Sequence, residues 1–180
     1  IEVPPAIAGL LCSAILSDTL LFRSPTCTQM DVNAAKALAK IAGIECESYA
    51  KQMFAAGSDL ASKTDEEILY QDFKMFEFGD FNVGIGQITS MNEEELSHIQ
   101  TTLYPYMNEV YQDKNVDMMF FMLTDIIQET TQLLCCGERA PDLVQEAFHK
   151  KVEDGSVRLP GVLSRKKQLV PSFMMAIGEL

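Results

Sequence analysis

Apolar and polar residues recur with a helical period along the first third of the chain. Residues 6–16 are apolar on nearly every side, which predicts a helix that belongs inside a larger structure. Residues 28–42 place apolar side chains on one helical face, with Thr28 as the cap and Gly43 as the stop. Residues 45–56 predict a third helix. The N-terminal third is therefore expected to be entirely helical.

The pattern changes beyond residue 60, where short apolar runs alternate with helical stretches. Residues 117–124 form an apolar run without a helical period, which is typical of a fully buried strand. Pro105 predicts a kink or break in its helix. The predicted strands are 73–78, 82–88, 117–124, 132–136 and 156–159, and the predicted helices are 64–70, 92–111, 141–151 and 171–178. Because strands and helices interleave, the expected fold class is α/β, with a mixed sheet flanked by helices.

Small and polar residues separate the helical third from the rest of the chain. Residues 55–59 read Ala-Ala-Gly-Ser-Asp, a composition typical of linkers. The expected organisation is a helical segment at 1–56, a linker at 57–59 and a second domain at 60–180.

Three consecutive cations stand out near the C-terminus. The stretch from Leu159 to Pro171 places residues 165–167 between two apolar triplets, with a proline on each side. Because Pro171 disfavours the helical conformation at Val170, a new element is expected to begin there. Arginine offers a planar fork for two phosphate oxygens, and lysine adds a mobile charge. The stretch thus predicts a positioned anion-binding turn, and the alternative is an ordinary solvated basic turn.

Composition limits the choice of partners. The 180 residues are 47% hydrophobic, enough for a packed core, and the net charge is −12. That charge argues against nucleic acid or an anionic membrane as the main partner. The positive field at residues 165–167 can still act locally, because charges are screened beyond about 8 Å at physiological salt. No apolar run reaches about 18 residues, so no membrane span is expected. The five cysteines form no Cys-x-x-Cys pair, which indicates buried, reduced thiols in the cytoplasm.

Three stretches carry a resemblance to a known family. Residues 159–168 include Leu-Pro-Gly and Ser-Arg-Lys-Lys-Gln, residues 14–26 include Ser-Asp-Thr, and residues 71–76 read Gln-Asp-Phe-Lys-Met-Phe. Their order and spacing resemble those of the manganese-dependent (family II) inorganic pyrophosphatases of the DHH phosphoesterase superfamily. The family also carries His-x-Asp-x-Asp and Asp-His-His motifs, and this sequence has neither. Because it also begins at Ile1 rather than methionine, we expect it to be the tail of the family's metal-binding lobe (1–56) and its complete second lobe (60–180).

The resemblance implies roles for four residues. Asp18 would be one ligand of a Mn2+ cluster, or of Mg2+ or Co2+ in its place, with most ligands supplied by an N-terminal lobe. Lys74, Arg165 and Lys166 would hold the phosphates, and no catalytic residue is assigned. Two alternatives stay open from the residues alone. Asp18 can be a turn aspartate bonded to nearby backbone, and Lys74 can be a solvent-facing strand lysine.

The function implied by the resemblance is hydrolysis of pyrophosphate to two phosphates in the cytoplasm. The isolated chain is expected to be inactive, because one carboxylate cannot hold a metal cluster. A DHH exopolyphosphatase and a non-catalytic anion-binding or interaction module are the alternatives. Lys167 and Gln168 are expected to anchor the loop. The apolar helix at 6–16 is expected to bury its exposed face by self-association, giving a homo-oligomer.

Overall fold

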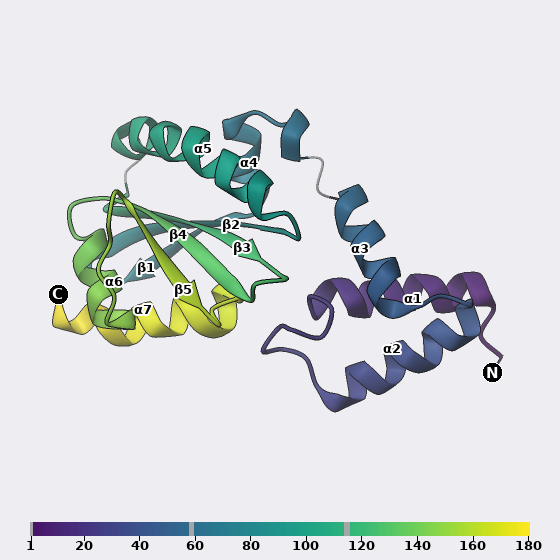
Figure 1. Ribbon diagram of the computed structural model, residues 1–180. Coiled ribbons are helices and arrows are strands. Elements are labelled where there is room, and N and C mark those ends of the chain that lie inside the picture. Colours follow the sequence, from purple (N-terminus) through teal and green to yellow (C-terminus); the bar gives the residue numbers. More distant parts are fainter. Residues whose placement is uncertain (1, 58–59, 114–115) are drawn as a thin grey trace. The chain divides into compact units, whose positions relative to one another are not determined.

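The structure, a computed structural model, describes residues 2–57, 60–113 and 116–180. The chain divides into two compact units, Ile1–Asp59 and Leu60–Leu180, and each is described by itself (Figure 1). Of the expected linker, Gly57 ends a helix, whereas residues 58 and 59 lie outside the described residues.

The first unit consists of the three helices that the sequence predicts. They are α1 (Pro5–Asp18), α2 (Gln29–Ala42) and α3 (Cys46–Gly57). Thr28 caps α2 in a reciprocal capping box with Asp31, and Gly43 ends it in the left-handed conformation. Over the described part of the chain, no helix combines the length and apolarity needed to cross a bilayer.

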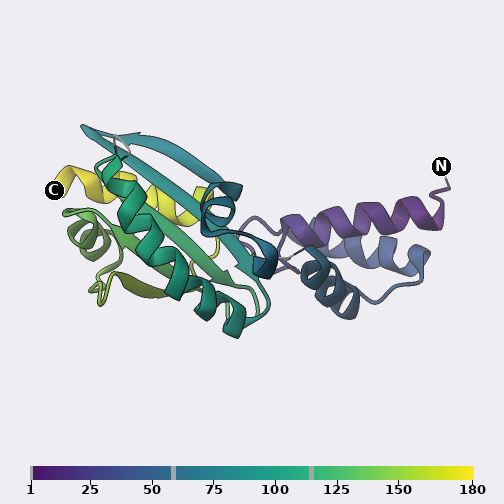
Figure 2. The same ribbon diagram turned by 90° about the horizontal axis from the view of Figure 1, so that it is seen from above.

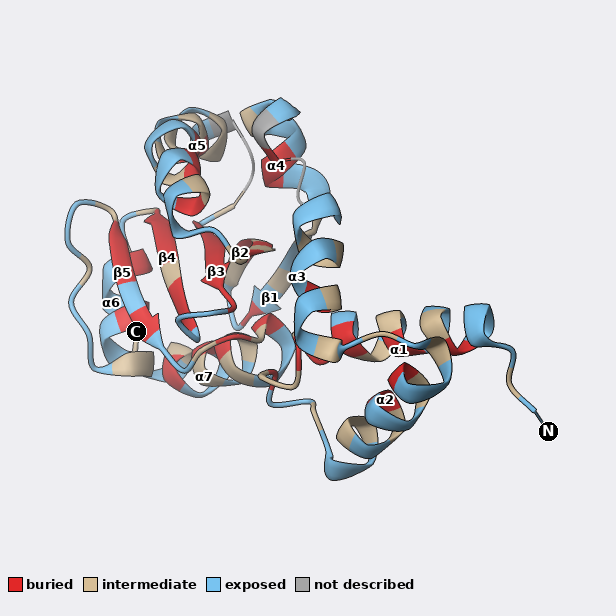
Figure 3. Ribbon diagram, turned by 45° about the vertical axis from the view of Figure 1, so that its right-hand side comes forward, coloured by how far each residue is buried: buried red, intermediate tan, exposed pale blue. Residues whose placement is uncertain are grey.

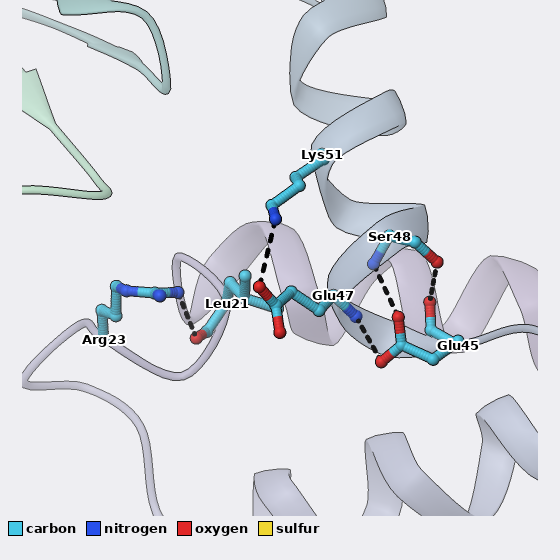
Figure 4. A network of polar contacts seen from close by, with 6 residues as sticks. All are labelled: Leu21, Arg23, Glu45, Glu47, Ser48 and Lys51. Carbon is cyan, nitrogen blue, oxygen red and sulfur yellow. Dashed lines mark hydrogen bonds and ion pairs between the residues drawn. The ribbon is translucent and has the colours of Figure 1, made fainter.

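A carboxylate sets the beginning of α3. The Glu45 side chain accepts hydrogen bonds from the backbone N–H groups of Ser48 at 2.8 Å and Glu47 at 3.0 Å (Figure 4). Both bonds lower the pKa of Glu45 below its ordinary value, and the bond from Ser48 contributes the most. They also occupy two of the N–H groups that the first turn of any helix leaves unpaired. The helix therefore begins at Cys46, immediately after its cap.

The second unit is built on a mixed five-stranded sheet. Its strands are β1 (Phe73–Phe78), β2 (Phe81–Ser90), β3 (Met118–Asp125), β4 (Thr130–Cys136) and β5 (Ser156–Pro160). They pair in sequence order, β2 with β3 in parallel and every other pair antiparallel. The parallel pair is joined by the helix α5 (Glu93–Asp113). The predicted α/β class and mixed sheet are confirmed.

Helices cover both faces of this sheet. One face packs against α4 (Asp65–Gln71) and α5, and the other against α6 (Ala140–Phe148) and α7 (Val170–Ala176) (Figures 1 and 2). Successive residues of β3 point into these two cores in turn, so the strand is buried along its whole length (Figure 3). The prediction of a fully buried strand at 117–124 is confirmed.

Two prolines depart in part from their local preferences. The helix predicted at 92–111 is confirmed, and α5 continues through Pro105 without a break, with Leu103 and Met107 fully buried against the sheet. Tertiary packing there offsets the lost hydrogen bond. A new element, α7, begins at Val170 as expected, but Val170 is itself helical, with φ −59° and ψ −48°, against the local preference that Pro171 imposes. Pro171 lies in the first turn of α7, where a missing N–H costs nothing, and the helix therefore runs on from the basic turn.

The five cysteines were expected to be buried, and only three of them are. All five cysteines are free; Cys12, Cys135 and Cys136 are buried, whereas Cys27 and Cys46 are half-buried. Burial raises the pKa of Cys136 to about 12 and raises that of Cys135 further. These two adjacent thiols therefore stay protonated and serve as core side chains rather than nucleophiles.

Residues 60–180 are expected to fold without the first unit. Both cores of the sheet lie within this segment, whereas α1 exposes Leu10 at 68% and Ile7 and Leu11 at 47% each. A chain of residues 60–180 should show one cooperative thermal transition by circular dichroism. In sedimentation velocity, the 180-residue chain should self-associate and the shorter one should not. A strictly monomeric 180-residue chain would contradict the second expectation.

Candidate functional site

The side chains at the two ends of the Ser-Arg-Lys-Lys-Gln segment fix the basic turn. Ser164 Oγ accepts a hydrogen bond from the backbone N–H of Lys167 at 3.2 Å. Gln168 Oε1 accepts from the N–H groups of Leu163 at 2.9 Å and Ser164 at 3.0 Å, and Gln168 Nε2 donates to the Gly161 carbonyl at 2.6 Å. The prediction that Gln168 anchors the loop is confirmed, and the Lys167 side chain is exposed.

The turn itself is a single π-helical turn, Arg165–Leu169, that leads directly into α7. The Val170 N–H bonds to the Arg165 carbonyl, five residues earlier. Single π turns are rare and frequently occur at functional sites. This one buries Arg165 and leaves Lys166 and Lys167 exposed, so adjacent cations have different environments.

Arg165 contacts the beginning of the sheet instead of extending into solvent. It is 5% exposed, and Nη1 donates to the carbonyl oxygens of Asp72 at 2.6 Å and Ile85 at 2.9 Å. Nη2 donates to Asp72 Oδ1 at 2.6 Å. Buried guanidinium groups are usually paired in this way, because an unpaired buried charge is very unfavourable. Arg165 is therefore not part of an ordinary solvated turn.

Asp72, which links α4 to β1, has both of its carboxylate oxygens occupied. Oδ1 accepts from Arg165, and Oδ2 accepts from Gln87 Nε2 at 2.7 Å. Burial opposes its ionisation, but the hydrogen bond and charge of Arg165, together with Gln87, lower the pKa of Asp72 below its ordinary value. Because the folded-state pKa is depressed, the pair persists at neutral pH and is lost only as pH falls through that lowered pKa. Sequence reasoning assigned no role to Asp72 or Gln87; only the proximity of Asp72 to Lys74 in sequence could have drawn attention to it.

Lys74 lies close to the backbone that Arg165 contacts. It is exposed on β1, and its partner across the β1–β2 ladder is Ile85, whose carbonyl accepts from Arg165. The charge of Lys74 also contributes to lowering the pKa of Asp72. The fold thus brings Lys74 and Arg165 to adjoining backbone, with Lys166 exposed next to Arg165 in the chain.

Glycines keep the backbone around this point closely packed. A Cβ at Gly84 would clash with the ring of Phe73, and one at Gly86 would clash with the ring of Phe121. The two glycines therefore mark places where aromatic rings pack directly against the backbone of β2. Without a Cβ at these two positions, the rings of Phe73 and Phe121 have room against the sheet.

Asp18 belongs to the first unit, where it is the exposed last residue of α1. Residues 20–22, which follow it, all have positive φ, between 48° and 67°. Thr19 Oγ1 supports this left-handed turn by donating to the Ile15 carbonyl and accepting from the Phe22 N–H. Among the described residues, no hydrogen bond to the Asp18 carboxylate is recorded, so the alternative of a turn aspartate bonded to backbone gains no support. A carboxylate at a helix C-terminus opposes the helix dipole, and a cation would offset this.

The donor set of the chain does not by itself fit a metal cluster. Mn2+ and Mg2+ are typically held by about six ligands, mostly oxygen. Nowhere in residues 2–57, 60–113 and 116–180 do three His, Cys, Asp or Glu side chains gather at such spacing. Asp18 can contribute one oxygen ligand, and the remaining protein ligands are not provided by the described residues.

A hollow of about 150 Å3 lies between α5 and the ends of β3, β4 and β5. It mixes carboxylates, amides and one cation with two leucines, and it includes none of the four predicted site residues. Its lining residues are Glu93, Leu96, Ser97, Gln100, Leu123, Asp125, Thr130, Gln132 and Arg158. The candidate phosphate site is therefore an open surface around the basic turn rather than this hollow.

The fold and the site define an α/β domain whose basic turn is fixed to the first strand of a mixed sheet. The family model of the DHHA2 domain matches residues 51–176. The chain therefore belongs to the DHHA2 domain family.

Curated relatives match almost the entire chain. A probable manganese-dependent inorganic pyrophosphatase of Clostridium acetobutylicum is 46% identical over 98% of this chain and 57% of its own length. A cobalt-dependent inorganic pyrophosphatase of Clostridium perfringens is 48% identical over 94% of this chain and 31% of its own length. The chain thus spans little more than half of the first of these relatives and less than a third of the second.

A solved structure has the same fold. The crystal structure of a Methanococcus jannaschii protein assigned to the family II inorganic pyrophosphatases superposes with a TM-score of 0.85. It is 40% identical in sequence, and the match covers 99% of this chain and 58% of that one.

Proposed function

We propose that this chain forms the pyrophosphate-holding part of an inorganic pyrophosphatase that uses Mn2+ or Co2+ and releases two phosphates. The observation that carries the proposal is the convergence of Arg165 and Lys74 on the backbone of Asp72 and Ile85. It creates a local concentration of cations in a chain of net charge −12. The names of the relatives support the choice of pyrophosphate and of the metals.

The proposed roles follow from the chemistry of the reaction. Transfer of a phosphoryl group needs charge neutralisation on the oxygens of the phosphoryl group whose phosphorus is attacked and on the phosphate that leaves. Arg165 can bind two oxygens at once, whereas Lys74 and Lys166 can follow the phosphates as mobile point charges. Divalent metals, when bound, supply the activated water. Asp18 would be one of their ligands, and the others would come from outside this chain.

The two units would then divide the task. We propose that residues 1–56 are the end of a metal-binding lobe, and that residues 60–180 are the substrate-binding domain. The division of the chain near residue 60 supports this boundary, whereas the match of the family model begins earlier, at residue 51 inside α3. The buried free thiols are consistent with the reducing cytoplasm, which is the proposed location.

Pyrophosphate binding by the chain itself tests the proposal. Isothermal titration without metal should detect binding, weakened about tenfold by Lys74→Ala or Lys166→Ala, since a lost charge contact of about 1.4 kcal/mol is a factor of ten. Lys151→Ala is the matched control, because Lys151 is an exposed lysine of the same unit, distant in sequence from the basic turn. Tripolyphosphate in place of pyrophosphate tests the longer-chain alternative. No binding, or an equal loss in the control, would contradict the proposal.

A further inference from the structure

We propose that Asp72 is a positioning residue, which holds Arg165 so that the unused edge of its guanidinium group is presented to a phosphate. This inference rests on the proposed function, because it assumes that Arg165 contacts the substrate. Asp72 would act only through Arg165 and would itself touch no phosphate.

The hydrogen bonds of Arg165 leave one edge of the guanidinium group available. The group has five N–H bonds. Both bonds of Nη1 are directed to carbonyl oxygens, and one bond of Nη2 is directed to Asp72 Oδ1. Because one residue, Asp72, accepts from both Nη1 and Nη2, we assign its two acceptor atoms to the edge between these nitrogens, and the Nε–H and the second Nη2–H then share the other edge. That edge matches the spacing of two phosphate oxygens.

The available edge is not sealed inside the protein. Within residues 2–57, 60–113 and 116–180, the one fully buried side-chain polar atom without a partner is Thr130 Oγ1. Within the described residues, Nε of Arg165 also has no hydrogen-bond partner, but it is not among the fully buried atoms. It therefore keeps contact with solvent even though the side chain is 6% exposed. We therefore expect a phosphate to approach Arg165 from this edge, with Asp72 remaining in place.

Asp72 is itself fixed, which makes it suited to positioning. Gln87 on β2 donates a hydrogen bond to the second carboxylate oxygen of Asp72. The backbone carbonyl of Asp72 also accepts a hydrogen bond from Arg165. Lys74 lies two residues further on, at the beginning of β1. A single residue thus determines both the orientation of the arginine and the distance between the turn and the strand that carries Lys74.

Binding measurements on three variants give a prediction of definite sign. Asp72→Ala should weaken pyrophosphate binding by the 180-residue chain about tenfold, and Asp72→Asn, which keeps one acceptor oxygen, should weaken it less. Coulomb's law alone predicts the reverse, because removal of a carboxylate near an anion site should tighten binding. Asp80→Asn is the matched control, since Asp80 is an exposed residue of the β1–β2 turn and loses the same charge. Thermal melts establish that each variant is folded.

The NMR resonance of the Arg165 Nε–H group distinguishes positioning from a purely structural role of Asp72, because a structural role would not change its response to pyrophosphate. This 15N–1H resonance is assigned by its absence from Arg165→Lys. Pyrophosphate should shift this resonance in the unaltered chain and shift it little in Asp72→Ala. If Asp72→Ala binds pyrophosphate as tightly as the unaltered chain, the positioning role is wrong and the proposed function stands. If pyrophosphate binds but leaves the resonance unchanged, both the positioning role and the phosphate contact proposed for Arg165 are wrong, whereas binding of pyrophosphate by the chain stands. If the unaltered chain binds no pyrophosphate, the proposed function fails and this inference fails with it.

Discussion

The Arg165→Ala variant is expected to lose far more hydrolytic rate than Lys167→Ala, when each is made in a protein that joins this chain to a metal-binding lobe. Arg165 combines a two-point contact to phosphate with the attachment of the basic turn to Asp72 and Ile85. Its loss should cost about 2–4 kcal/mol of transition-state stabilisation, or tens to hundreds-fold in kcat/KM. Lys167 is exposed, and its loss should cost under about 1 kcal/mol.

Steady-state phosphate release with saturating Mn2+ measures both effects. Arg165→Lys separates charge from shape, because lysine keeps the charge but cannot make the two-point contact. Recovery of most of the rate by lysine would mean that charge alone matters. Thermal melts are needed beside the kinetics, since alanine at 165 also leaves the Asp72 carboxylate without its buried partner. Equal losses for Arg165→Ala and Lys167→Ala would overturn the assignment of Arg165.

The second large effect is the expected inactivity of the 180-residue chain on its own. The described residues gather no three metal-binding side chains, and Asp18 alone cannot hold a cluster of divalent cations. Without such a cluster no water is activated, and the cations at residues 74, 165 and 166 can only bind anions. With millimolar Mn2+, phosphate release should stay at the uncatalysed background, at least about a thousandfold below the longer protein.

The control for this measurement is a protein that extends the chain on its N-terminal side with a metal-binding lobe of a relative. Comparable turnover by the two proteins would show that these 180 residues contain a complete metal site. The proposed division of roles between the lobes would then be wrong. Binding of pyrophosphate by the 180-residue chain without turnover would fit the division as proposed.

The local elements were largely predictable, because their causes lie within a few residues. Thr28 and Thr64 cap their helices through bonds to residues three positions further on. The six consecutive apolar residues 118–123 predict a strand that is buried on both faces, and β3 is buried in this way. Where tertiary contacts compete with local preference, the local preference gives way. Buried Leu103 and Met107 hold α5 together across Pro105, and Val170 is helical although Pro171 follows it.

The sequence by itself determined the fold class, the helices of the first unit and the presence of a cationic segment at residues 165–167. It indicated Lys74 only through the family resemblance of residues 71–76, because a lysine in a predicted strand can equally face solvent. It did not reveal that Arg165 is buried or that Asp72 and Gln87 hold it. Arg165 is separated from Asp72 by 93 positions and from Ile85 by 80. Contacts over such separations leave no periodic pattern and no local motif in the sequence. Only the packing of the π-helical turn against the sheet decides which N–H groups of Arg165 bond within the protein and which remain for a ligand.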